Sequence, residues 1–472
     1  MKCQFFSNAK QVLAFKWAAV FSPVLLSYAI PPPSGLSNNA WCSTALYIAA
    51  LLGVIIKPVQ ESAVVLILAS ISCLQGNTKE VLMGFSNETV WLVFSAFMLG
   101  AAFVNSGLGK RVAFLLIKRF GNTTLKLGYI MVLLDLLLSP AIPSSTARSG
   151  GIVYPIFADI PHLLKTGKQS VAAYFCFLQY WASIATSVLF VTACSPNVMT
   201  VSFGEQFLHE SVSWSEWAAA MALPGMGVLL TVPLILHFLF SPASVSSQQV
   251  QENVSQYLKP SGPPNSKEKL FVLLFVAAII GWLLGDFLSI STVAVALVFL
   301  ACSIFLGIIS WEDIQKQKDG WSTFIWYGFI LGFMGLLNNL GVFFWLTEKI
   351  TRYTNLQKLP MIVLIVLLTL FCMLLRYYFV SMAAYVSVVV PVLFLLSHAV
   401  QLPTRILFFI VAALTSYTSL LTHYGTALGP ILYAKNLVGQ KRWWKTGLIT
   451  CVYSISIFLL IGLVLWKFKH IW

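Results

Sequence analysis

The sequence has few charged residues and no long polar domain. Charged residues make up 9% of its 472 residues, whereas soluble proteins average about a quarter. Hydrophobic residues make up 58%, in apolar runs that reach the roughly 18 residues needed to cross a bilayer as a helix. These runs lack the alternation of a membrane β-barrel, and backbone groups in lipid must bond internally. The composition therefore excludes a soluble fold and predicts an all-α integral membrane protein.

The sequence also lacks the usual signatures of catalysis and metal binding. It contains no P-loop, no catalytic triad pattern and no cluster of metal ligands. Its eight cysteines are scattered through apolar segments without a CxxC pair, which indicates buried, unpaired thiols. We therefore expect a protein that is not an enzyme and has no cofactor, unless sodium accompanies its cargo.

Acidic residues are scarce: 15 stand against 29 basic ones, a net charge of +14. The basic residues form short clusters between apolar runs, as at 110–111 and 441–442. This pattern fits membrane orientation and not a nucleic-acid face. Lys2 and Lys10 favour an N-terminus on the inner side, and we interpret the run 12–30 as a retained first helix.

The longest polar stretch, residues 241–268, divides the chain into membrane halves 1–240 and 269–472. Three landmarks recur in the same order on its two sides. In the first pair, FSAFMLG (94–100) and Gly109 match WYGFILG (326–332) and Gly341. In the second pair Ser144 matches Ser381, and in the third Pro196 matches Pro430. The offsets are 232 (341 − 109), 237 (381 − 144) and 234 (430 − 196). The halves are predicted to be related repeats, inverted if each has an odd number of crossings.

A polar break interrupts the first half at 138–151, LSPAIPSSTARSGG. Its two prolines remove backbone donors and end a helix, so the freed groups need a protein or water-lined partner. The next half-helix then presents free N–H groups and a positive dipole end, which suit a carboxylate. Ser144, Ser145 and Thr146 add hydroxyls at the same place, so we expect a substrate anion there.

Arg148 follows this break at a depth where arginine costs about 2.5–3.5 kcal/mol on insertion scales. One interpretation is a fixed positive charge beside the anion site. The other is a structural arginine that snorkels or pairs with Asp135. On the first interpretation, Arg148→Ala abolishes transport and leaves the protein folded.

Two other breaks, 192–197 and 422–430, combine small residues, hydroxyls and a proline, whereas a third at 376–385 is less polar and on its own would fit a packing helix with one serine. We expect the substrate also to contact Ser381, Met382, Ala383 and Tyr385 in one, Thr192, Pro196 and Asn197 in another, and Thr422, Gly425, Thr426 and Pro430 in the last.

The motifs PSSTARSGGIVYPI, TACSPN and THYGTALGP resemble those of the divalent anion:sodium symporter superfamily, in its di- and tricarboxylate exchanger branch. The resemblance implies about eleven membrane-spanning helices plus two re-entrant hairpins in inverted repeats. It also implies a homodimer, and a transport domain that moves as a rigid body like an elevator.

In that family a Ser-Asn-Thr motif in each half meets the substrate carboxylates. Ser144 and Thr146 match the first motif, but Ser145 stands where asparagine is usual. In the second half only Ser381 matches, because 382–383 are less polar than usual, and Tyr385 stands where exchangers often have histidine. Arg148 stands where the exchanger branch carries arginine, which favours transport without sodium.

The sequence thus predicts exchange of C4–C5 dicarboxylates, with 2-oxoglutarate and malate ahead of citrate and succinate. The alternative is a sodium-coupled dicarboxylate or citrate symporter. A membrane enzyme or a channel is a weaker interpretation. The partners we expect are di- and tricarboxylate anions, lipid and a second copy, without nucleic acid. The expected location is a bacterial inner membrane or a plastid inner envelope.

Overall fold

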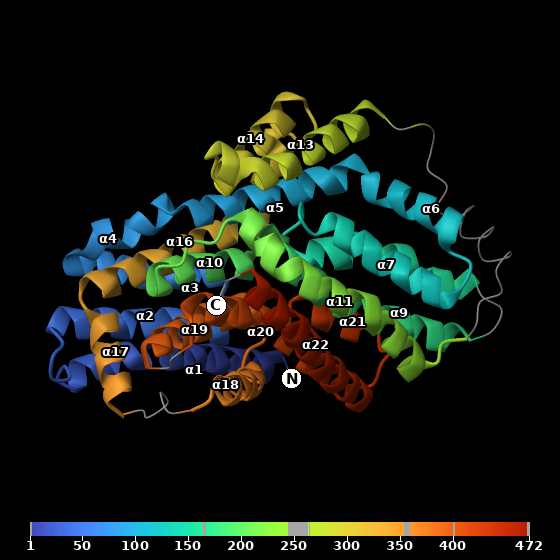
Figure 1. The fold of residues 1–472 in the computed structure, drawn as a ribbon. Coiled ribbons are helices and arrows are strands. Elements are labelled where there is room, and N and C mark those ends of the chain that lie inside the picture. The colour runs from blue at the N-terminus through green and yellow to red at the C-terminus, as the bar shows by residue number, and fades with distance from the viewer. Residues whose placement is uncertain are drawn as a thin grey trace.

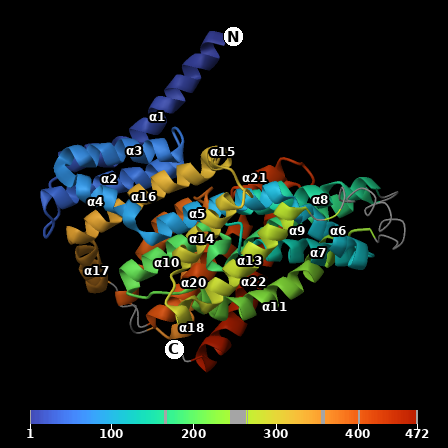
Figure 2. The same cartoon turned by 90° about the horizontal axis from the view of Figure 1, so that it is seen from above.

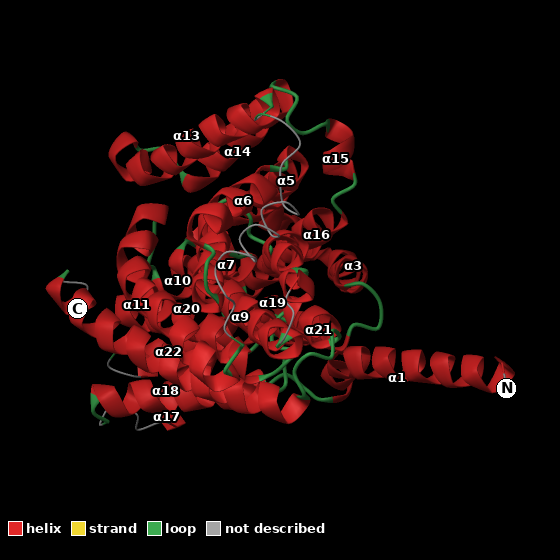
Figure 3. Ribbon diagram, turned by 90° about the vertical axis from the view of Figure 1, so that its right-hand side faces the viewer, coloured by secondary structure: helices red, strands yellow, loops and turns green. Residues whose placement is uncertain are grey.

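The computed structural model describes residues 2–163, 167–243, 263, 265–353, 359–399 and 402–469, and these residues form helices without strands (Figure 3). Eight of the described helices are long and apolar enough to cross a membrane, or up to nine if the bent pair 61–86 and 88–104 is one span. The predicted all-α membrane architecture is confirmed, while the number of about eleven spans stays a prediction.

The described part of the first half contains eleven α-helices, coloured from blue to green in Figure 1. They are α1 (Lys2–Ala29), α2 (Asn38–Ile56), α3 (Glu61–Ser72), α4 (Thr78–Met83), α5 (Glu88–Ser106), α6 (Leu108–Phe120), α7 (Thr124–Leu138), α8 (Tyr154–Ala158), α9 (Lys168–Leu189), α10 (Ser195–Leu208) and α11 (Trp214–Phe240). The π-helical segment Thr146–Val153 precedes α8.

The described part of the second half contains ten α-helices. They are α13 (Ser266–Leu288), α14 (Thr292–Phe305), α15 (Trp311–Gln315), α16 (Lys318–Asn339), α17 (Val342–Tyr353), α18 (Met361–Arg376), α19 (Met382–Leu395), α20 (Thr404–Tyr417), α21 (Leu428–Tyr433) and α22 (Gln440–Phe468). Of the predicted connecting segment 241–268, residues 244–262 and 264 lie outside the described residues, and α13 begins within it.

The two halves repeat one order of elements: a long helix, a short amphipathic helix, a broken hairpin, a broken long helix and a final long helix. These are α5 to α11 in the first half and α16 to α22 in the second. Gly107 and Gly341 occupy the same place, each at φ +74° between the long and the short helix. Glycine adopts this left-handed conformation without steric cost. The pairing of Gly109 with Gly341 was therefore wrong by two residues, because Gly109 lies inside α6.

The equivalent helices α5 and α16 run in opposite directions where they pack (Figures 1 and 2). Near the start of α16, Trp321 and Phe324 pack on Phe94 of α5, with ring centroids 4.8 and 5.3 Å apart. Further along α16, Gly332 lies against the carbonyl of Val81 in α4, which precedes α5. Residue numbers rise along one helix and fall along the other, so the repeats are inverted.

Each half contains a hairpin whose arms are short. The arms α7 and α18 have 15 and 16 residues, and at 1.5 Å per residue they reach about 22–24 Å, less than a hydrocarbon core of about 30 Å. Their lengths fit re-entrant hairpins. The second arms cross over to the other half: the segment 146–153 packs on α21, and α19 packs on α10.

The helix α1 packs on α2, and its N-terminal part extends away from the other helices (Figures 2 and 3). Only 17% of its apolar window is buried inside the protein. A helix this apolar and this exposed fits a lipid surface.

Candidate functional site

The tip of the first hairpin is the segment 139–146, between α7 and the π-helical arm. The Ser144 hydroxyl accepts a hydrogen bond from the Ala147 backbone N–H at 3.2 Å, which starts this arm in the manner of a helix cap. Ser144, Ser145 and Thr146 are partly exposed. Ser144 borders a cavity of about 140 Å³ between the tip, α5 and the start of α16. The predicted hydroxyls are thus accessible at the tip.

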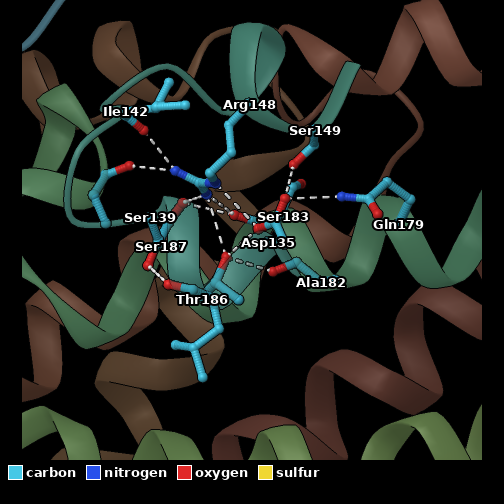
Figure 4. A network of polar contacts seen from close by, with 12 residues as sticks. Asp135, Ser139, Ile142, Arg148, Ser149, Gln179, Ala182, Ser183, Thr186 and Ser187 are labelled. Carbon is cyan, nitrogen blue, oxygen red and sulfur yellow. Dashed lines mark hydrogen bonds and ion pairs between the residues drawn. The ribbon is translucent and has the colours of Figure 1, made fainter. Parts of the chain in front are cut away.

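Arg148 is fully buried and lies directly behind this tip (Figure 4). Its Nε–H donates to Asp135 Oδ2 at 3.1 Å. Its Nη1 and Nη2 groups donate to the carbonyl oxygens of Ile142 (2.7 Å), Ala193 (2.9 Å) and Ser183 (3.1 Å) and to the hydroxyls of Thr186 (3.2 Å) and Ser187 (3.0 Å). A guanidinium has five N–H bonds, so these acceptors can engage all of them.

Asp135 is as deeply buried as Arg148, and its carboxylate oxygens also have hydrogen-bond donors. Besides Arg148, it accepts from the Gln179 amide at 2.9 Å and from the Thr186 hydroxyl at 2.5 Å. The Ser149 hydroxyl also donates to it (Figure 4). The pair is formally neutral and ties the first hairpin to α9 and to the break that follows α9. This geometry matches the second interpretation of Arg148, a structural pair with Asp135.

The second hairpin tip is the segment 377–381. The Ser381 hydroxyl accepts from the Ala384 backbone N–H at 3.4 Å and caps α19. Ala383 is partly exposed, whereas Met382 and Tyr385 are buried. The Tyr385 hydroxyl donates to the Cys372 carbonyl at 3.3 Å, so this side chain closes the hairpin.

Arg376 ends the first arm of this hairpin and is also fully buried. Its Nη2 group donates to the carbonyl of Gly425 in the break between α20 and α21. Its Nε and Nη1 atoms have no acceptor among the described residues, and no ion pair involves it there. Its guanidinium carbon lies 4.8 Å from the centre of the Tyr385 ring. Arg376 is thus a buried cation with unused donors.

The break between α9 and α10 is held by side chains that bond its backbone. The Asn197 amide donates to the carbonyls of Ser187 (2.6 Å) and Phe190 (3.0 Å). The Thr192 hydroxyl accepts from the Trp214 indole at 3.1 Å. Pro196 is buried in the first turn of α10, where a missing N–H is tolerated. These three predicted residues therefore shape the break.

The break between α20 and α21 is organised in the same way. The Tyr180 hydroxyl of α9 lies 2.6 Å from the Ser419 carbonyl and 2.7 Å from the Thr422 carbonyl, as a donor to both. The Thr426 hydroxyl accepts from the Gly429 N–H at 3.2 Å. The Thr422 hydroxyl is buried without a partner among the described residues. Pro430, in contrast, is exposed.

An arginine connects each hairpin to the break of its own half: Arg148 to Ala193 and Arg376 to Gly425. Ala193 and Gly425 are 232 residues apart (425 − 193), which is close to the repeat offset. Among the residues that the structure describes, no hydrogen bond joins the tip 144–146 to the tip 381–383. The predicted residues therefore form two related clusters.

Sequence reasoning did not weigh Arg376 as a site residue, although the break that it begins was recognised. The signal was available, since an arginine at membrane depth is costly wherever it stands. Arg376 was overlooked because the residues around it in the sequence are mostly apolar and contain no polar motif. Asp135 was considered as a partner of Arg148, but the hydroxyls and carbonyls that complete the network come from α9 and the following break, which sequence spacing does not reveal.

Two inverted halves, each with a hairpin and a broken helix, have the architecture of a secondary membrane transporter. The chain belongs to the family described as the sodium:sulfate symporter transmembrane region, which matches residues 11–472. This match confirms the resemblance seen in the motifs.

The relatives span nearly the whole chain. The inner membrane protein YbhI of Escherichia coli (strain K12) is 36% identical and covers 95% of this chain and 96% of its own. The putative malate transporter YflS of Bacillus subtilis (strain 168) is 28% identical, with 95% of each covered. The L-tartrate/succinate antiporter of Escherichia coli (strain K12) is 29% identical, with 95% and 97% covered.

Among solved structures, the Alcanivorax borkumensis YdaH transporter matches with a TM-score of 0.56. The match covers 84% of this chain and 89% of that one at 13% identity. At this identity the likeness shows the fold alone.

Proposed function

We propose that this protein is a secondary active carrier that exchanges C4–C5 dicarboxylates, such as 2-oxoglutarate and malate, without sodium. Related proteins bear the names of malate, tartrate and succinate transporters. The partly exposed hydroxyls of Ser144, Ser145 and Thr146 stand at a half-helix N-terminus, where free N–H groups suit a carboxylate.

The observation that carries the proposal is an excess of buried positive charge beside the breaks. Arg148 and Arg376 are both fully buried, but Asp135 is the one buried carboxylate beside them in the described residues. The net charge of about one unit is fixed to the protein and cannot leave with the cargo. One carboxylate of the substrate pairs with this charge, whereas the unloaded carrier must cross with the charge unpaired. Obligate exchange follows from this penalty.

Three further features belong to the proposal. The carrier works as an elevator, in which the hairpins and broken helices move against the helices around α5 and α16. It forms a homodimer, as the family resemblance implies. It resides in a bacterial inner membrane, because the relative YbhI is named an inner membrane protein, and the plastid envelope is the remaining alternative.

The sodium-coupled symporter is the alternative, and one observation favours it. Asn197 Oδ1 is a buried acceptor without a donor among the described residues, while its amide group is engaged. An unused carbonyl-type oxygen is a ligand that a hard cation accepts.

Uptake of labelled malate into proteoliposomes separates the two proposals. We expect uptake that requires an internal dicarboxylate from a panel of di- and tricarboxylates and is unchanged when choline replaces sodium. Uptake that needs sodium and no internal counter-substrate would contradict exchange and support the symporter.

A further inference from the structure

We infer that Arg376 binds a carboxylate of the substrate, while Arg148 is a structural residue that holds the first hairpin. This inference rests on the proposed function and assigns the charge at its centre to a particular side chain. It differs from the expectation that Arg148 carries this role.

The two arginines differ in their hydrogen bonds. Every N–H of Arg148 has an acceptor, and Asp135 compensates its charge. Arg376 has one acceptor, the Gly425 carbonyl. Its other four N–H bonds, among them the one on Nε and both on Nη1, have no acceptor among the described residues. A buried guanidinium left in this way is costly unless an anion completes it.

The position of Arg376 explains how the second half can provide a charge. Tyr385 follows the tip of the second hairpin and carries no charge of its own. The guanidinium of Arg376 lies over the Tyr385 ring, 4.8 Å from its centre. The face of a tyrosine ring attracts a cation. The positive charge of the second hairpin thus lies beside the Tyr385 ring.

A second buried donor without a described partner lies on the break that Arg376 contacts, between α20 and α21. The hydroxyl of Thr422 is buried without a partner among the described residues. Gly425, which Arg376 contacts, lies three residues further along, and the Gly425 N–H donates to the Thr422 carbonyl at 3.4 Å. The Tyr180 hydroxyl holds the carbonyls of this turn, so the turn is fixed.

These donors select the chemistry of the ligand. Guanidinium N–H groups only donate, so the partner must be an acceptor, and burial of the charge requires that it be an anion. A carboxylate accepts short, charge-assisted hydrogen bonds from such groups. We therefore assign one carboxylate of the dicarboxylate to Arg376.

Arg376→Gln tests the assignment. Glutamine keeps a donor for the Gly425 carbonyl but removes the charge, so the fold should persist. We expect the half-saturating concentration of malate for exchange in proteoliposomes to rise about 100-fold, as for loss of one partner of a buried charge pair. The purified wild type should gain thermal stability with malate or 2-oxoglutarate, and the variant should not. Arg376→Lys keeps the charge, so its half-saturating concentration should lie between those of the wild type and Arg376→Gln.

Arg442→Gln is the matched control. Arg442 is exposed at the start of α22, with its guanidinium 4.4 Å from the Phe240 ring. Like Arg376→Gln, this substitution removes one positive charge and a contact with an aromatic ring, but at a place away from the breaks. The half-saturating concentration of malate for exchange should therefore be unchanged.

A rescue experiment separates binding from packing. In the double variant Arg376→Gln, Tyr385→His, a histidine that is protonated at low pH offers a cation at the same place. Exchange relative to wild type should recover at pH 5.5 and be lost again at pH 8, while Arg376→Gln alone shows no such change.

Two results would overturn the assignment: a half-saturation of Arg376→Gln within twofold of wild type, or a rescue equal at both pH values. In either case an active wild type leaves the proposed function intact. A wild type that neither exchanges nor is stabilised by any dicarboxylate refutes the proposed function itself.

Discussion

At the residue scale, the Arg148–Asp135 pair is the most constrained group near the site. Both side chains are fully buried, and their partners come from the hairpin, from α9 and from the following break. Removing one member of a buried pair leaves an uncompensated charge, which costs about 3–5 kcal/mol. The network therefore couples the position of the hairpin to the broken helix.

This pairing changes the expectation for Arg148→Ala. The variant should lose about 3–5 kcal/mol of stability, because Asp135 is left buried without its counter-charge. Denaturant unfolding of the purified protein in detergent measures the loss. The double variant Arg148→Gln, Asp135→Asn should lose less than the two single changes together, since neither charge then remains.

Arg405→Gln is the control for this prediction. Arg405 pairs with Glu210 and Glu216 at 3.6 and 2.7 Å but is 37% exposed, so its loss should cost no more than about 1 kcal/mol. If Arg148→Ala were as stable as Arg405→Gln, the structural role of Arg148 would be refuted.

The sequence alone could single out Arg148 but could not choose between its two interpretations. Its charged partner lies 13 residues earlier, and the carbonyl of Ala193 lies 45 residues later. Such contacts depend on how a hairpin folds back on a distant break. The predicted hydroxyls at 144–146 follow from local chemistry, and they do lie at a tip.

At the element scale, the helices follow from apolar length, and the breaks follow from proline, glycine and hydroxyl residues. The register of the repeat was less accurate. The similar aliphatic sequences aligned Gly109 with Gly341. The positive φ angle that Gly107 and Gly341 share shows that Gly107 is the equivalent of Gly341. Sequence similarity in apolar helices does not report φ angles, so an error of two residues arises easily.

Close packing of α16 on α4 gives a prediction for a single helix. A Cβ at Gly332 would overlap the Val81 carbonyl oxygen, whereas one at Gly335 meets nothing within 4 Å. Gly332→Ala should lower stability by about 1–3 kcal/mol through overpacking. Gly335→Ala, on the same helix, should be neutral or slightly stabilising. Equal unfolding midpoints for the two variants in detergent would show that the helices do not approach this closely.

At the scale of the whole molecule, the inverted repeat brings the second arm of each hairpin onto a helix of the other half. The sequence revealed the repeat through its landmarks but left its orientation open. The orientation depends on the number of membrane crossings in each half, and the lengths of apolar segments do not give that number reliably. The opposite directions of α5 and α16 supply the orientation (Figure 1). The excess positive charge at the breaks could not be predicted from the sequence either, because the sequence does not show which buried arginine has an acidic partner.

The central claim is that a fixed, uncompensated positive charge prevents the empty carrier from returning. Efflux from proteoliposomes loaded with labelled malate, diluted into sodium-free buffer, tests it directly. We predict that the label stays inside until an external dicarboxylate is added and then leaves rapidly. Equally fast loss into substrate-free buffer would contradict the account.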